Sequence, residues 1–379
     1  MILLAFPWDS NPYQRLLYGE MEKLGAQVRY AGRLTPSHTL NVLLLPLELA
    51  VWRLKGARFV HLHWVFGFAF TGADRFPALR HLAQVWFLLW LWTIRVLRMR
   101  LIWTAHNVLP HDRVFADDVA ARVALVRRSD LVVTHGDHVV PELASLGAVP
   151  RRSVVVRHGP FLPTQLVSSL RVPGSGAGPR HLLFFGRVHA QKGVEDLLTA
   201  FLGLPDRAGC HLTVAGECRD LDLRSRLEAA VADRPSRVTL RLQRIQDDEV
   251  TNLLSSADAV VLPFRQVTTS GSAVLALCHG RPVIVPDLQS LRDIPEAATI
   301  RYDGSVASLQ AALLGVASAG AEMLRAMSVA AFEYADPSCW TVAAQCMMAQ
   351  IRHLHGYYGQ RQTTPYRHES ARSVSGQDR

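Results

Sequence analysis

The sequence predicts an α/β protein of two domains, each built around a doubly wound parallel sheet. Short apolar runs alternate with helical patterns along most of the 379 residues, which is the order that parallel sheets require. Residues 161–180 are rich in proline and glycine and separate two halves of similar size. Because the chain is longer than one typical domain, we expect domains at residues 1–160 and 181–335, joined by this linker.

Composition narrows the classes of partner. A hydrophobic content of 49% suits well-filled cores, and the formal charge of +9 favours a polyanionic partner such as a phosphorylated substrate or an anionic membrane. The chain lacks zinc-finger, recognition-helix and RNA-binding signatures, so we expect no nucleic-acid partner. Its five cysteines have no CxxC spacing, which predicts reduced thiols. No basic segment precedes the apolar start, so we interpret it as a buried strand of a cytoplasmic protein.

The first half opens with a strand, a loop, a helix and a second strand. Residues 1–6 form an apolar run, a helical pattern extends from Tyr13 to about Leu24, and residues 27–30 resemble a strand. The first loop contains Asp9 and has no GxGxxG pattern. Since ligands bind beyond the carboxyl ends of parallel strands in such folds, Asp9 is a candidate site residue.

Residues 58–64 are predicted to form a strand that ends near two histidines. Alternation along the strand places His61 and His63 on one face. Two histidines at this spacing can hold a metal ion, but no third ligand follows at a fitting spacing. We therefore expect hydrogen bonding or packing from this pair.

Residues 85–94 form the most hydrophobic segment, with arginines on both sides. Ten residues are too few to span a bilayer, which needs roughly twenty. One interpretation is a core helix between two strands, and the other is a tryptophan-rich helix that lies at a membrane interface. Residues 42–52 are a second apolar stretch, bordered by Arg53 and Lys55. Both interpretations stay open.

A dense polar loop follows the predicted strand at residues 100–105. It contains His106, His111 and Asp112, which suit acid–base chemistry or the binding of sugar hydroxyls. The alternative is a hydrated loop that Asp112 caps. Strands at residues 131–134 and 153–157, with a helix between them, complete the first sheet.

The second half repeats the alternation. We expect strands at residues 181–185, 211–215, 238–242, 259–262 and 282–285, separated by helices, and only helices from there to about residue 355. A C-terminal helix is expected at residues 336–358. Residues 359–379 are polar and lack an apolar stripe, which predicts disorder.

Two loops of the second half predict a diphosphate site. Arg187 and Lys192 lie in a loop beside Gly186 and Gly193, where two cations can neutralise a diphosphate that the backbone approaches closely. About eighty residues later a helix begins in a turn whose free amides favour an anion. This turn contains Thr269, Ser270, Gly271 and Ser272. An ordinary Ser or Thr cap is the simpler alternative.

These motifs resemble the GT-B glycosyltransferases, a group that includes the family-four enzymes. The resemblance rests on FFGRVHAQKG at residues 184–193, HGP at 158–160, the pair Ala215 and Gly216, SSADAVVLPFR at 255–265 and GRPVIVPD at 280–287. It implies two Rossmann-like domains that face a central cleft and a C-terminal helix that returns to the first domain near Trp340. It also implies that Arg187 and Lys192 contact the diphosphate of a nucleotide-sugar donor and that His106 lies near the transferred sugar.

One motif of the family is missing. Retaining family-four enzymes carry a Glu-x7-Glu motif, and the matching positions here are Val267 and Leu275. The variant is more similar to bacterial exopolysaccharide enzymes, including inverting β-mannosyltransferases that use GDP-mannose. We therefore expect inversion, with Asp112 as the general base and His106, His63 and Asp9 as rivals. The only DxD, residues 220–222, is interpreted as helix-capping carboxylates, so no metal or other cofactor is expected.

The resemblance also sets the expected partners. They are a nucleotide-sugar donor, GDP-mannose being favoured, and a lipid-linked or oligosaccharide acceptor of polysaccharide or glycolipid synthesis. The basic, tryptophan-rich first domain suits peripheral contact with the inner face of the membrane. A retaining transferase that uses a UDP-sugar, a catalytically inert nucleotide-sugar-binding partner and an epimerase of the same fold are the alternatives.

Overall fold

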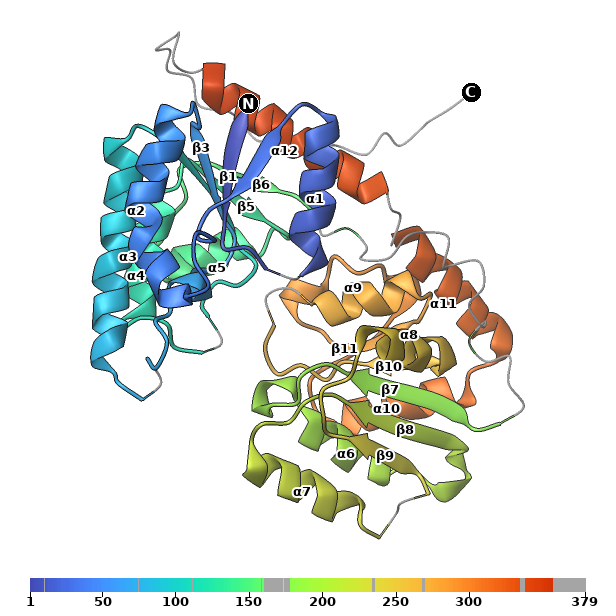
Figure 1. Ribbon diagram of the computed structural model, residues 1–379. Helices are drawn as coiled ribbons and strands as arrows, with labels where there is room; N and C mark the ends of the chain where they lie inside the picture. The colour runs from blue at the N-terminus through green and yellow to red at the C-terminus, as the bar shows by residue number, and fades with distance from the viewer. Residues whose placement is uncertain are drawn as a thin grey trace, which may run out of the picture.

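The computed structural model describes residues 1–9, 11–73, 75–110, 112–157, 159, 173, 178–233, 236–267, 270–334 and 338–356. These residues form two α/β domains, each with one parallel sheet of six strands (Figure 1). The predicted two-domain α/β class is therefore confirmed. Most of the predicted linker at residues 161–180 and all of the predicted tail at 359–379 lie outside the described residues.

The first sheet has the strand order β2-β1-β3-β4-β5-β6, and every neighbouring pair is parallel. Its strands are β1 (Ile2–Phe6), β2 (Gln27–Tyr30), β3 (Phe59–Leu62), β4 (Arg100–Thr104), β5 (Leu131–Thr134) and β6 (Ser153–Val155). Its helices are α1 (Pro12–Lys23), α2 (His38–Leu54), α3 (Ala78–Val96), α4 (Asp118–Arg128) and α5 (Val139–Ser145). The strand predicted at residues 58–64 ends at Leu62, so His63 lies in the loop that follows.

The second sheet has the order β12-β11-β10-β7-β8-β9. Its strands are β7 (Arg180–Phe185), β8 (Cys210–Ala215), β9 (Val238–Arg241), β10 (Ala259–Val261), β11 (Val283–Pro286) and β12 (Thr299–Tyr302). Its helices are α6 (Val194–Leu202), α7 (Leu221–Val231), α8 (Asp247–Ser256), α9 (Gly271–Cys278), α10 (Val306–Ser318) and α11 (Ala321–Tyr334). Read from β9, the order 3-2-1-4-5-6 reverses direction between β7 and β10, which is where such sheets bind ligands.

The strand β12 corrects the expectation that only helices follow residue 285. Its four residues pair in parallel with β11, and Thr299 and Tyr302 at its two ends are buried. So short a segment shows little periodicity in the sequence. The edge of β11 supplies the partner that makes it a strand.

The last helix, α12 (Ser338–Gly356), packs on the first domain (Figure 1). Its buried residues Trp340, Ala344, Met347 and Ile351 recur at the spacing of one helix face. They join the apolar cluster that includes Leu17 of α1. The chain thus ends its described part on the domain with which it began.

Two smaller expectations are confirmed. All five cysteines are free thiols. The first carboxylate of the DxD, Asp220, caps α7, because the amide of Leu223 donates to its Oδ1 at 3.0 Å.

Candidate active site

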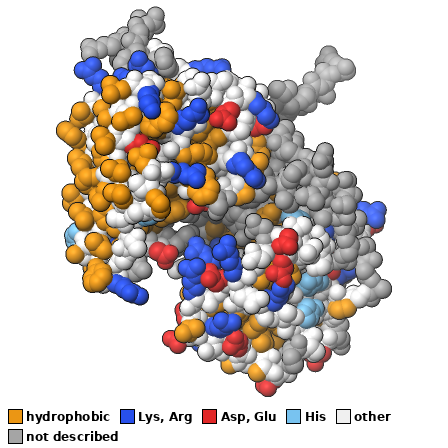
Figure 2. Space-filling view, in the orientation of Figure 1, with side chains coloured by type: hydrophobic (Ala, Val, Ile, Leu, Met, Phe, Trp, Pro, Cys, Tyr) orange, Lys and Arg blue, Asp and Glu red, His pale blue; other side chains and the backbone are white. Residues whose placement is uncertain are grey.

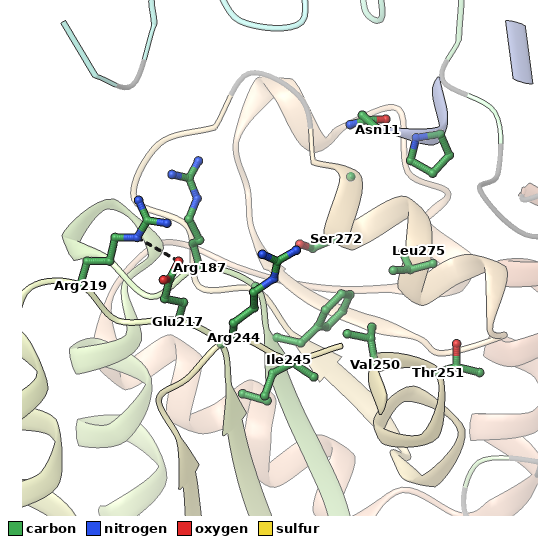
Figure 3. Close-up of a pocket in the computed structure, with 16 residues that line it drawn as sticks. Asn11, Arg187, Glu217, Arg219, Arg244, Ile245, Val250, Thr251, Ser272 and Leu275 are labelled. Carbon is green, nitrogen blue, oxygen red and sulfur yellow. Dashed lines mark ion pairs between the residues drawn. The ribbon is translucent and has the colours of Figure 1, made fainter. Parts of the chain in front are cut away.

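A cavity of about 590 Å³ opens at the carboxyl edge of the second sheet. It is lined by the loops that follow β7, β8 and β9 and by residues of α8 and α9. Asn11 and Pro12 of the first domain close it from the opposite side (Figure 3). The cavity therefore lies at the strand ends where a doubly wound sheet binds ligands.

One half of the cavity is cationic. Arg187, Arg219 and Arg244 are exposed, and their guanidinium groups point toward the same open space (Figure 3). Among the described residues that line the cavity, the single carboxylate is that of Glu217, whose Oε2 lies 3.0 Å from Nε of Arg219. Three cations against one anion make this half a binding surface for a multiply charged anion.

The other half of the cavity is apolar. Phe185, Ile245, Val250 and Leu275 line it, and Thr251 adds one hydroxyl (Figure 3). Flat apolar walls with few polar groups are typical of pockets that hold a ring system. The cavity thus offers adjacent places for a planar ring and for an anion.

Backbone approach at two glycines shapes the cationic half. Gly216 has a φ of +155°, and a Cβ atom there would lie 1.8 Å from the carbonyl oxygen of Gly186. A Cβ atom on Gly186 would in turn lie 3.3 Å from Oγ of Ser272. The two loops predicted to form a diphosphate clamp are therefore in contact, as close approach without side chains allows.

Lys192 is not among the described residues that line the cavity, but it lies near the other predicted cation, Arg187. Its Nζ lies 4.1 Å from the centroid of the Phe264 ring, a cation–π contact. Burial lowers the pKa of Lys192 to about 8, and the charge of nearby Arg187 contributes to this shift. Both effects disfavour the ammonium form, so an anion bound here would restore it.

The helix α9 begins at the cavity, as the sequence predicts. Oγ of Ser270 accepts a hydrogen bond from the amide of Ala273 at 3.1 Å, which is an N-cap contact. Gly271 and Ser272 follow and line the cavity. Thr269, the fourth predicted residue of this turn, lies outside the described residues. Capping and ligand binding are compatible here, because the amides of Gly271 and Ser272 lie in the unpaired first turn.

A cluster of histidines occupies the carboxyl edge of the first sheet. His63, His106 and His135 follow the adjacent strands β3, β4 and β5, so the topology brings them together. Nδ1 of His63 lies 3.0 Å from Nε2 of His106, and Nδ1 of His106 lies 3.1 Å from Nε2 of His135. The three rings are buried, and half-buried Trp64 stacks on His106 at a centroid distance of 4.5 Å.

His61 belongs to the same cluster, and it forms the hydrogen bonds that the sequence predicts. Its Nδ1 lies 2.9 Å from the hydroxyl of Tyr18, which also lies 2.6 Å from Nε2 of His63. Among the described residues, no three His, Cys, Asp or Glu side chains are placed to hold a metal ion together.

The histidine cluster meets the second domain at a small cavity of about 40 Å³. His135 and His138 line it from the first domain, and Ser270, Asp293 and Tyr334 line it from the second. The start of α9 therefore faces the large cavity through Ser272 and this small cavity through Ser270.

The two carboxylates predicted as candidate bases have different surroundings. Asp112 is exposed, and its negative charge reaches Arg219 of the second domain. The pKa of Arg219 is raised mainly by its hydrogen bond with Glu217, and the charge of Asp112 raises it further. Asp9 is half-buried in the first loop, where its Oδ1 accepts from the amide of Asn11 at 2.7 Å. Asp9 thus orders the loop that carries Asn11 to the cavity.

Comparison with known proteins agrees with this architecture. Residues 179–318 match the family described as Glycosyl transferases group 1. The fold is that of a sucrose-phosphate synthase from Thermosynechococcus elongatus, with a TM-score of 0.68 and 17% identity over 94% of this chain and 99% of that chain. Anabaena HepE in complex with UDP and glucose is also similar, with a TM-score of 0.67 and 14% identity over 93% and 99% of the two chains. The described fold is therefore the GT-B fold, and residues 179–318 are similar to the group 1 glycosyltransferases.

Curated relatives match this chain over part of their length. A GDP-mannose:glycolipid 4-beta-D-mannosyltransferase of Xanthomonas campestris pv. campestris is 32% identical over 118 residues, which are 31% of this chain and 33% of the relative. A glycogen synthase of Mycobacterium tuberculosis is 32% identical over 115 residues, 30% of this chain and 27% of the relative. The aligned segments therefore span about a third of these relatives.

Sequence reasoning missed several residues of this candidate site. His135 follows β5 as His106 follows β4, and that shared position after a strand is the signal that could have revealed it. Glu217 and Arg219 follow Gly216 after β8 in the same way. Tyr18 lies in the middle of α1, where a tyrosine on the buried face is indistinguishable from core packing until the fold places it.

Proposed function

We propose that this glycosyltransferase moves a sugar, with mannose from GDP-mannose favoured, to a lipid-linked or glycan acceptor of polysaccharide or glycolipid synthesis, with inversion. One observation carries the proposal: a single cavity joins a cationic half, at the start of α9, to an apolar half. A nucleotide sugar has these two parts, since its base is a flat ring and its diphosphate is a dianion.

Donor binding follows from this division. Arg187 and Lys192 would neutralise the diphosphate, and the amides of Gly271 and Ser272 would donate to its oxygens. The base would enter between Ile245 and Val250, where Thr251 is the polar side chain in reach. The mannosyltransferase relative is named for GDP-mannose, which supports that donor, whereas the complex of HepE with UDP supports the alternative of a UDP-sugar.

Inversion is supported by the absence of the two glutamates. Leu275 lines the cavity and Val267 packs beside the apolar cluster of α9, so neither position offers a carboxylate to the sugar. Formation of a β-mannoside from GDP-mannose, whose anomeric carbon is α, requires inversion. The relative named as a 4-beta-D-mannosyltransferase makes such a product.

Asp112 is our candidate for the general base. Its carboxylate would take the proton of the acceptor hydroxyl as that oxygen bonds to the anomeric carbon. The bond from this carbon to the diphosphate breaks, and its electron pair leaves with the nucleoside diphosphate, which Arg187 and Lys192 stabilise. His63 and His106 are weaker candidates because each uses its ring nitrogens within the cluster, and Asp9 because it holds the amide of Asn11.

We also propose that α2 and α3 dock this enzyme on an anionic membrane. The indole of Trp86 donates to the carbonyl of Val42 at 2.9 Å, and Nε of Arg53 donates to the carbonyl of Leu97 at 2.9 Å, so the helices lie side by side. Each has an exposed apolar stripe at helical spacing (Figure 2). The stripes are Leu40, Leu43, Leu47, Val51 and Leu54 on α2, and Leu82, Val85, Leu89, Trp92 and Val96 on α3. An apolar face of this extent is a docking surface.

Charge favours a lipid over another occupant. Exposed Lys55, Arg95 and Arg98 lie at the carboxyl-terminal ends of the two helices. The one carboxylate within either helix, Glu48, is buried and accepts from the amide of Gly32 at 2.8 Å. An apolar stripe bordered by cations suits the interface of an anionic bilayer, here the cytoplasmic face where a lipid-linked acceptor would be reached.

No single helix among the described residues has both the length and the hydropathy to cross a bilayer. One pair of helical segments, Val306–Ser318 and Ala321–Leu354, is long and apolar enough when the two are taken together, but the pair is bent by 109°.

Calorimetric titration with GDP, UDP and dTDP tests the donor site. We expect one nucleotide to bind most tightly, and Arg187→Ala and Lys192→Ala each to weaken it about tenfold to a hundredfold, because a hydrogen bond between charged groups contributes about 1.5–3 kcal/mol. Arg226→Ala is the control, since Arg226 is an exposed cation of α7 that pairs with Glu195.

The outcomes separate the alternatives. Binding of none of the three nucleotides by the folded protein would overturn the proposal. Nucleotide binding without transfer from any nucleotide sugar to any acceptor would leave the inert binding partner. The anomeric configuration of a product separates the inverting from the retaining mechanism.

A further inference from the structure

A continuous chain of hydrogen bonds runs through six side chains of the first domain, from Thr104 to the backbone of Val156. The hydroxyl of Thr104 lies 2.8 Å from Nε2 of His61, whose Nδ1 contacts Tyr18. Tyr18 contacts His63, and the rings of His106 and His135 follow. At the far end, Nδ1 of His135 lies 2.8 Å from the carbonyl oxygen of Val156.

The carbonyl of Val156 fixes the direction of every bond in this chain. A carbonyl only accepts, so Nδ1 of His135 carries the hydrogen, and in the neutral ring its Nε2 then accepts from His106. The same reasoning places a hydrogen on Nδ1 of His106 and on Nδ1 of His63. Nε2 of His63 therefore accepts from the hydroxyl of Tyr18.

The order continues to the other end. Because Tyr18 gives its only hydrogen to His63, its oxygen accepts from Nδ1 of His61. Nε2 of His61 then accepts from the hydroxyl of Thr104. In this order each neutral ring supplies one hydrogen and accepts one, and an added proton would break a bond of the chain.

Burial acts in the same direction. It lowers the pKa of His61 to about 3 and the pKa of His135 to about 4. It also holds the pKa of His63 well below the usual value, with help from the neighbouring rings. An imidazolium in this cluster would be largely removed from solvent and would lie beside other rings.

We propose that the carbonyl of Val156 holds His135, His106 and His63 as neutral rings protonated on Nδ1, and that Tyr18 and His61 are positioning residues that hold the ring of His63 at the other end of the chain. His135 lines the small cavity that Ser270 shares, and His106 supports the ring of Trp64. The chain ends on a carbonyl, which takes no proton at neutral pH, so it orients groups and carries no proton out of the cleft. Only the effect of this order on turnover rests on the proposed function.

Nitrogen-15 NMR of histidine side chains tests the order directly. In the wild-type protein we expect all four rings to carry hydrogen on Nδ1 at neutral pH, with each ring assigned from its own substitution. A ring with hydrogen on Nε2 and not on Nδ1, or a doubly protonated ring, would overturn the proposal.

Cutting the chain at its two ends should have unequal effects. Tyr18→Phe removes the donor to His63, yet it leaves His106 and His135 tied to Val156, so both should keep hydrogen on Nδ1. His135→Phe removes the link to Val156, so His63 and His106 should show both tautomers. Equal effects of the two variants would refute a chain ordered from the carbonyl. If His135→Phe does not fold, the spectra of the wild-type protein and of Tyr18→Phe still test the proposed order of hydrogen bonds.

Turnover supplies the second readout. We expect Tyr18→Phe to lower kcat about tenfold, because one hydrogen bond that orients the histidine rings is lost. The KM for the donor should stay within about twofold of the wild-type value, because Tyr18 lies outside the donor cavity. The control is Tyr30→Phe, which removes a hydroxyl from the ring that neighbours Tyr18 at 6.1 Å and is not part of the chain. An unchanged kcat in Tyr18→Phe would overturn the positioning role. A wild-type chain that transfers no sugar would instead overturn the proposed function, and the tautomers would still be measurable.

Discussion

The two domains present contrasting chemistry at the same place in their sheets. Both sheets are parallel and six-stranded, and both collect polar groups at their carboxyl edges. The edge of the second sheet carries exposed guanidinium groups, among them Arg187 and Arg244, around an open cavity. The edge of the first carries buried neutral histidines that bond to one another.

This difference shows that the location of a site and the ligand that it binds are determined separately. Parallel strands with short loops place their carboxyl ends together, so the fold determines the location of both edges. The residues directly after the strands determine the chemistry. Here they place cations at the edge of the second sheet and uncharged, hydrogen-bonded histidines at the edge of the first. We expect the donor on the charged edge and the acceptor chemistry beside the neutral edge.

The largest expected effect tests whether the first edge supplies the base. Asp112→Asn should lower kcat about a hundredfold to ten-thousandfold, because it removes the proton acceptor, while calorimetry should show little change in nucleotide affinity. Asp137→Asn, at an exposed carboxylate in the loop after β5, is the control. A kcat close to the wild-type value in Asp112→Asn would return the role of base to the histidines or to Asp9.

The second largest effect concerns membrane binding by the apolar face of α2 and α3, compared with the outer surface of the second domain. Replacing Leu47 and Trp92 together by glutamate should weaken sedimentation with vesicles of mixed neutral and anionic lipid at least about tenfold, since each apolar side chain contributes about 1.5–3 kcal/mol when buried. Met323→Glu, at a residue of α11 with an exposed fraction of 53%, is the control in the second domain. If the wild-type protein does not bind vesicles but dimerises through the apolar face of α2 and α3, a second copy of the chain covers that face.

The smallest effect concerns the charge of the second edge. The pKa of Lys192 is about 8, so its ammonium is present at lower pH and is lost as the pH rises through that value. Nucleotide affinity should therefore fall above pH 8, by up to about tenfold per pH unit, while Arg187 stays charged. Calorimetry across this range tests the effect, and Lys192→Arg should flatten the decline. An equally steep decline in Lys192→Arg would assign the titration to another group.

Much of the second edge was predictable from the sequence because its signals are local. Gly186 and Arg187 follow one strand directly, and Ser270 begins a helix. The structure brings these two loops close together at Gly186 and Ser272, and their role as a diphosphate clamp stays a prediction. The edge of the first sheet was only partly predictable: His63 and His106 were candidates, but the sequence gives no reason to connect them with Tyr18.

By itself the sequence determined the class of fold, the order of most strands and helices, and the loops that carry charge, because periodicity and turn residues act within short segments. Only the tertiary structure decided that β12 is a strand and that α2 and α3 share one apolar face. It also decided that four histidines bond in a fixed order. These features depend on contacts between segments tens of residues apart, and strand pairing and the crossing of helices establish such contacts only when the chain has folded.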